Sequence, residues 1–78
     1  MPITTLRQLL DEATEKLNTT KVPDPRYDAR ALLMSAYQLS PAQYLLYEHD
    51  APEALIPRVL PDAEALSAAT TLFQANVD

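Results

Sequence analysis

Residues 24–47 read DPRYDARALLMSAYQLSPAQYLLY, and this stretch predicts two helices joined by a short turn. The carboxylate of Asp24 can accept hydrogen bonds from the first free backbone N–H groups of one helix. Pro25 then takes the first helical position, where its missing N–H costs nothing. Ser40 and Gln43 have the spacing of a capping box, in which each side chain accepts from the other residue's backbone N–H. The second helix therefore starts after Ser40.

Apolar side chains repeat at helical spacing through both predicted helices. In the first they are Ala29, Leu32, Leu33, Ala36 and Tyr37. The second should end near His49 and carries the apolar block Tyr44, Leu45, Leu46 and Tyr47. Leu39 and Tyr44 have the spacing of a hydrophobic staple, which fixes the angle at which the chain enters a helix. We interpret these two helices as the core pair against which the rest of the chain packs.

A helix on either side has a start signal and an apolar stripe of its own. Thr5 and Gln8 form a capping box, and the stripe that follows is Leu6, Leu9, Leu10, Ala13 and Leu17. This helix should end at Asn18, which tolerates the left-handed backbone of a C-terminal cap. Asp62 can cap the last helix, 63–76, whose stripe is Leu66, Ala69, Leu72, Phe73 and Val77.

The connection before the last helix predicts a further short helix. Asp50 and Glu53 have capping-box spacing, with an acid as the cap. Pro57 cannot sit in a helix interior, so this helix should end or kink there. Val22, in the connector after the first helix, should insert into the core. Because no segment alternates long enough for a strand, we predict an all-α fold. It is a small bundle of four to five short helices forming a single domain over residues 1–78.

The composition excludes several classes of function. The chain has no glycine, so it carries no P-loop, dinucleotide-binding fingerprint or nucleophile elbow. It has no cysteine, which fits the cytoplasm, and its first residues do not form a secretory signal. The formal net charge is −5, and the six basic residues are scattered along the sequence. Because nucleic acid and anionic membranes need clustered positive charge, we expect neither as a direct partner.

The order and spacing of these signals resemble the N-terminal domain of the HemK (PrmC) family over residues 4–47. The family's opening helix is threonine-capped, of the type T-x-R-x-L-L, and TLRQLL stands at 5–10. Its second helix has the pattern P-R-x-D-A-x-x-L-L, and residues 25–33 read PRYDARALL. A leucine-serine turn follows, here Leu39 and Ser40. After that stretch the resemblance is one of helical character alone.

This resemblance implies a function for the parent protein. The family consists of S-adenosylmethionine-dependent methyltransferases that modify the glutamine of the Gly-Gly-Gln loop in peptide-chain release factors. The chain would be the helical domain that helps to hold the release factor, joined to a catalytic domain that lies outside these residues. The family's glycine-rich cofactor loop and its Asn-Pro-Pro-Tyr motif have no counterpart here. We therefore predict no catalytic, cofactor-binding or metal-binding residue in this chain.

Arg26, Tyr27 and Arg30 are the candidate partner surface. The two arginines are four residues apart and flank Tyr27 on a side of the helix that should be exposed. They could grip a carboxylate on the release factor or on the catalytic domain, or they could pair with nearby acids such as Asp24. Tyrosine is enriched at interfaces, although most of the four tyrosines should be core residues with a solvated hydroxyl.

Other polar residues have structural interpretations that we prefer to functional ones. His49, the one histidine, suits a helix C-terminus, where a cation faces exposed carbonyl groups. Asp24 and Asp28 suit a cap and a first-turn acid better than a pair of catalytic carboxylates. Three acids on the first helix should form a solvated face rather than a docking surface for a basic partner: Asp11, Glu12 and Glu15.

Two other hypotheses remain open. The chain could be a free-standing acidic helical adaptor that binds another protein through one helix face. A DNA-binding helix-turn-helix is suggested by the short turn between the second and third helices, and the charge opposes it.

Overall fold

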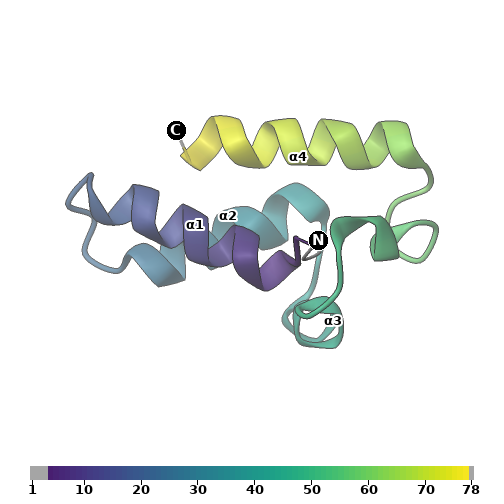
Figure 1. Cartoon of the computed structure of the whole chain (residues 1–78), viewed down its shortest axis with the longest axis horizontal. Coiled ribbons are helices and arrows are strands. Elements are labelled where there is room, and N and C mark those ends of the chain that lie inside the picture. Colours follow the sequence, from purple (N-terminus) through teal and green to yellow (C-terminus); the bar gives the residue numbers. More distant parts are fainter. Residues whose placement is uncertain (1–3, 78) are drawn as a thin grey trace.

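The predicted bundle forms in the computed structural model, which describes residues 4–77. Its elements are the α-helices α1 (Leu6–Asn18), α2 (Pro25–Tyr37), α3 (Pro41–Tyr47) and α4 (Ala63–Val77), with the 3-10 helix η1 (Pro52–Leu55) before α4. No strand occurs in this part of the chain. Figure 1 shows α1 and α2 lying together, α4 running alongside them, and α3 at one end. The all-α fold class is therefore confirmed.

Four of the five predicted N-terminal caps are confirmed, those of the α-helices. Thr5 and Gln8 form the reciprocal capping box of α1, with N···O distances of 2.9 and 3.2 Å. The Asp24 carboxylate accepts from the backbone N–H three residues later, at 3.1 Å. Ser40 forms the capping box of α3, again at 2.9 and 3.2 Å. Asp62 caps α4 through its carboxylate at 2.9 Å. Each of these side-chain caps joins residues that are three apart in the sequence.

The helix α1 ends at the predicted residue, but the predicted C-terminal cap is wrong. Asn18 is the last residue of the helix, and the cap is Thr19 in a right-handed conformation, with φ −77°. The hydroxyls of Thr19 and Thr20 each donate to a backbone carbonyl three residues earlier, at 2.7 Å. Because these threonines satisfy the free carbonyl groups of the last turn, Asn18 does not need a left-handed backbone. The left-handed residue of this connector is Lys21, with φ 63°.

The predicted cap of η1 is also wrong. Ala51 precedes η1, and no side chain caps the helix. The backbone at this point serves α1 instead, since the carbonyl of Asp50 accepts from Leu6 N–H at 3.0 Å. The carbonyl of Glu48 accepts from Arg7 N–H at 2.9 Å. Two first-turn donors of α1 are therefore satisfied by a segment more than forty residues away in sequence.

The core centres on α2, and the predicted pairing of α2 with α3 is wrong. The most extensive helix contact is between α1 and α2, followed by that between α2 and α4. In the seven-residue α3, Tyr44 and Tyr47 are buried, whereas Leu45 and Leu46 are 63% and 69% exposed. A helix this short presents one narrow face to a neighbour, so residues three apart are buried while those between them face solvent.

The last helix packs one face onto the core and leaves the other exposed. Of its predicted stripe, Leu66, Ala69, Phe73 and Val77 are buried. Leu72 is 51% exposed, so its predicted place in the core is wrong. Because α4 contacts α2 far more than α1, its buried stripe is too narrow to include Leu72. Two other predictions hold, since η1 ends before Pro57 and Val22 packs against the core.

Two leucines test this division between core and surface. Leu33 is fully buried on α2, and Leu45 is 63% exposed on α3. Leu33→Ala should lower the free energy of unfolding by about 2–5 kcal/mol, because it leaves a cavity in the core. Leu45→Ala should change it by less than about 0.5 kcal/mol. Urea unfolding followed by far-ultraviolet circular dichroism measures both, and equal losses would contradict the described core.

Candidate functional site

A partly exposed apolar stripe runs along α2, in which Tyr27 is exposed and Met34 packs in part against the core. Tyr27, Ala31 and Met34 follow one another at offsets of four and seven residues, which places them on one helix face. With Arg30 and with Pro41 of α3, they line a hollow of about 240 Å³. We call these five residues the α2–α3 surface. A hollow between two helices offers a partner side chain a place to insert.

Large apolar side chains are concentrated around this hollow. Tyr27 is 70% exposed, and Leu45 lies one turn after Pro41 on the same side of α3. Leu46 is exposed beside it. The fourth exposed large apolar residue among those described, Leu72, lies on α4. Exposed apolar side chains beside a hollow are typical of protein–protein contacts.

Two arginines of α2 are held in place next to the hollow. The guanidinium of Arg30 stacks over the ring of Tyr44, 5.2 Å from its centroid. Arg26 forms an ion pair with Asp11 of α1, with an Nη1–Oδ1 distance of 3.0 Å. Both partners of this pair are about half exposed, at 53% and 54%, so the pair contributes little to stability. The expected pairing of Arg26 with an acid is confirmed, although the acid is Asp11 rather than Asp24.

The charges that shift the pKa of Tyr44 show which basic side chains lie near its hydroxyl. Burial raises the pKa of its hydroxyl above the ordinary 10.0, and the charge of Glu48 raises it further. The positive charges of Arg7, Arg26 and Arg30 act in the opposite direction. Three of the six basic residues therefore lie near one ring, although they are scattered in the sequence. The fold therefore brings three arginines together, with the carboxylates of Glu48 and Asp11 among them.

The remaining candidates take structural positions. Asp24 caps α2, and Asp28 lies in its first turn. His49 follows α3 and faces solvent, with Nε2 3.0 Å from a carboxylate oxygen of Glu48. Among residues 4–77, no three His, Asp or Glu side chains are arranged to hold a metal ion. The three acids of α1 are exposed, and Asp11 is the one that pairs with Arg26.

Sequence reasoning placed Arg26, Tyr27 and Arg30 together but missed the apolar half of the site. Tyr27 and Arg30 line the hollow, whereas Arg26 turns toward α1. Ala31 and Met34 could have been found, since they continue the helical spacing that starts at Tyr27. Pro41 belongs to another helix, and nothing in the sequence indicates its proximity.

The fold and this surface define a small all-α domain with one apolar and basic face. The family model of the PrmC N-terminal domain matches residues 8–69 of the chain, from the first turn of α1 into α4. The chain therefore belongs to this family, and the membership implies a methyltransferase family for the parent protein. No curated protein and no solved structure matches the chain.

The family match extends beyond the segment on which the sequence resemblance rests. It includes α3, η1 and the first half of α4, so each element of the described bundle falls at least partly within it. No helix within residues 4–77 is long and apolar enough to cross a membrane.

The two buried tyrosines with shifted pKa values make stability depend on alkaline pH. Burial is the main cause that raises the pKa of Tyr37 above 10.0; the charge of Glu53 adds to it, and the hydrogen bond between Tyr37 and Thr70 opposes it. A raised pKa in the folded state means that the unfolded chain loses the tyrosine proton first. The free energy of unfolding should therefore be steady below about pH 9 and fall as the pH rises above about 10.

Urea unfolding at a series of pH values measures this slope. Tyr37→Phe should make the slope shallower, because it removes one of the titrating groups. Tyr27→Phe, the same chemical change at an exposed position, should leave it unchanged. An alkaline slope that Tyr37→Phe does not alter would contradict the assignment.

Proposed function

We propose that this chain is the helical substrate-recognition domain of an S-adenosylmethionine-dependent protein-(glutamine-N5) methyltransferase that acts on peptide-chain release factors. The family match over residues 8–69 carries this proposal. The domain has no catalytic residues of its own, and S-adenosylmethionine is bound by the catalytic domain of the parent. The site of action is the cytoplasm, where release factors work.

The physical need for such a domain follows from the reaction. A side-chain amide nitrogen must be brought close to the methyl donor and held in line with it before it can be methylated. A second contact, away from the reacting atoms, restricts the orientation of a large protein substrate. The helical domain supplies that contact, while its other faces are available to the catalytic domain of its own chain.

The α2–α3 surface suits this contact in its chemistry. The hollow accepts an apolar side chain of the release factor, and Tyr27 adds a large aromatic surface with few rotatable bonds. Arg30 provides a guanidinium that can bind a carboxylate in a bidentate geometry. Because the ring of Tyr44 already orders Arg30, less side-chain entropy is lost when a carboxylate binds.

Binding to a purified peptide-chain release factor tests this proposal. Arg30→Ala and Tyr27→Ala should each weaken binding about tenfold, because Arg and Tyr dominate the energy of interfaces. Leu72→Ala is the matched control: it truncates an exposed apolar side chain on α4 and should change the dissociation constant less than about twofold. Isothermal titration calorimetry measures all three affinities.

Two results would count against the proposal. If neither α2 variant weakened binding, the α2–α3 surface would not be the contact. If the unmodified chain did not bind the release factor at all, the second hypothesis, an acidic helical adaptor for another protein, would be favoured.

A further inference from the structure

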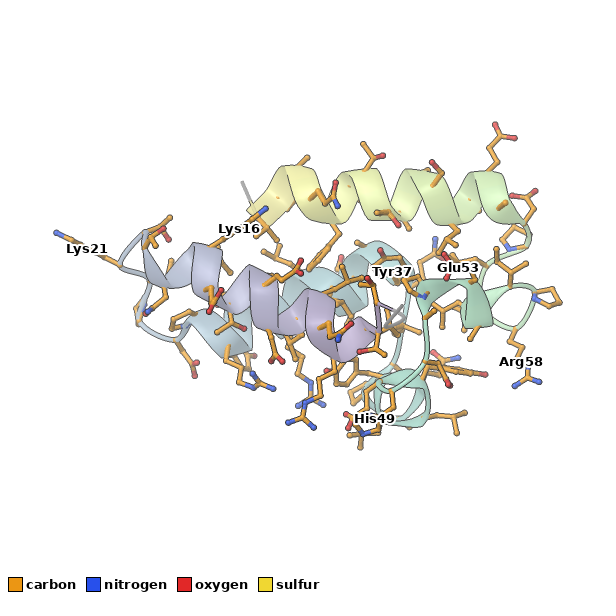
Figure 2. All side chains as sticks on the ribbon, in the orientation of Figure 1. Lys16, Lys21, Tyr37, His49, Glu53 and Arg58 are labelled. Atoms are coloured by element: carbon orange, nitrogen blue, oxygen red, sulfur yellow. The ribbon has the colours of Figure 1, made fainter. Side chains whose placement is uncertain are left out.

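A second hollow, of about 370 Å³, lies where the start of α1, η1 and α4 meet. Thr4 and Leu9 come from the α1 side, Pro52 and Glu53 from η1, and Thr70 from α4. Tyr37 of α2 closes its inner end, and Figure 2 shows Tyr37 and Glu53 at this junction. We call this hollow the Glu53 cleft. Its volume lies within the range of about 300–1,000 Å³ that is typical of ligand pockets.

The hydroxyl groups of Tyr37 and Thr70, which line the cleft, can accept further hydrogen bonds but have no hydrogen left to donate. The Thr70 hydroxyl donates its one hydrogen to the backbone carbonyl of Leu66, at 3.0 Å. Tyr37, whose hydroxyl oxygen lies 2.8 Å from Thr70 Oγ1, must therefore be the donor of that bond. The hydrogens of both hydroxyls are thus used inside the protein. Neither of these two hydroxyls can therefore donate a hydrogen bond to an anion in the cleft.

Glu53 gives the mouth of the cleft a negative charge. Its side chain is exposed, and its charge acts on the Tyr37 hydroxyl behind it. No basic side chain among residues 4–77 forms an ion pair with it. A cation that entered the cleft would meet a carboxylate that is not already paired with a basic side chain of the described residues.

The walls of the cleft are apolar below this carboxylate. Leu9, Pro52 and Leu66 line it, and Leu66 is buried. Arginine and lysine combine a charged head with an apolar stem, and they bury the stem along apolar surface while the head stays near polar groups. Such a side chain matches the cleft in both charge and polarity.

The cleft continues along the line where α1 and α4 face each other. Leu9 also lines a smaller hollow of about 30 Å³, whose charged lining residues are Glu12 and Lys16 and whose apolar ones include Phe73 and Val77. This continuation exists because α1 and α4 contact each other at few points. A free cation would fill the cleft alone, whereas a peptide could place one side chain in it and extend along the groove.

We propose that the Glu53 cleft binds an arginine or lysine side chain presented by a segment of a partner protein. This surface is separate from the α2–α3 surface, and the proposal does not depend on the release factor as substrate. The domain then has a second contact site, whose negative charge selects a basic segment of a partner.

The test uses two peptides that differ in one charge. They are acetyl-Ala-Ala-Arg-Ala-Ala-amide and the same peptide with citrulline, an uncharged analogue of arginine similar in shape. Titration of the isotope-labelled chain, followed by nuclear magnetic resonance, should shift the amide signals of Thr4, Leu9, Glu53 and Thr70 in a saturable way. The arginine peptide should bind about two- to fivefold more tightly than the citrulline peptide, as expected for one exposed ion pair.

A pair of variants separates the cleft from net charge. Glu53→Gln should abolish the preference for arginine, and its exposed position means that the fold is retained. Glu64→Gln removes the same charge at an exposed position of α4 outside the cleft and should preserve the preference.

Four results would overturn the proposal. The two peptides could bind equally, or Glu64→Gln could weaken binding as much as Glu53→Gln. Arginine amide alone could bind as tightly as the peptide, which would identify a free cation rather than a protein segment. Dilution of the chain without peptide could shift the same signals, which would identify a second copy of the chain as the occupant.

Discussion

The burial of α2 on two sides is the constraint on which the rest of this structure depends. Within residues 4–77, α2 is the one helix in extensive contact with both α1 and α4. Tyr37 is central to this arrangement, since it is fully buried, its ring lies 6.1 Å from that of Phe73, and its hydroxyl is bonded to Thr70. Ala29 and Ala36 are small enough to let neighbouring helices approach α2 closely.

Both candidate surfaces follow from this central position. A helix that is covered on two sides still has a third, and on α2 that side carries Tyr27, Ala31 and Met34. Because α1 and α4 both pack on α2 rather than on each other, they leave the groove that contains the Glu53 cleft. One surface is basic and apolar and the other is acidic and apolar, so the two favour partner segments of opposite charge.

Local chemistry could be predicted from the sequence, and the choice of helix partners could not. Asp24, Ser40 and Asp62 cap their helices because the donors that they satisfy lie within four residues. The pairing of α2 with α3 was wrong because the apolar block 44–47 contains more apolar side chains than a seven-residue helix can bury. For the candidate site, too, the local features could be predicted and the tertiary contacts could not. The helical spacing placed Tyr27 and Arg30 together, but the approach of Pro41 and the gathering of Arg7 near Tyr44 depend on the tertiary fold.

The two backbone bonds between the start of α1 and the carbonyls of Glu48 and Asp50 close a ring of chain that contains α1, α2 and α3. No side chain takes part in this closure, so its chemistry is the same for almost any residue at these four positions. The side chains at positions 7, 48 and 50 can change during evolution while the ring stays closed, whereas Leu6 is also held by its burial in the core. Proline at position 6 or 7 is the exception, because it would remove the donor itself.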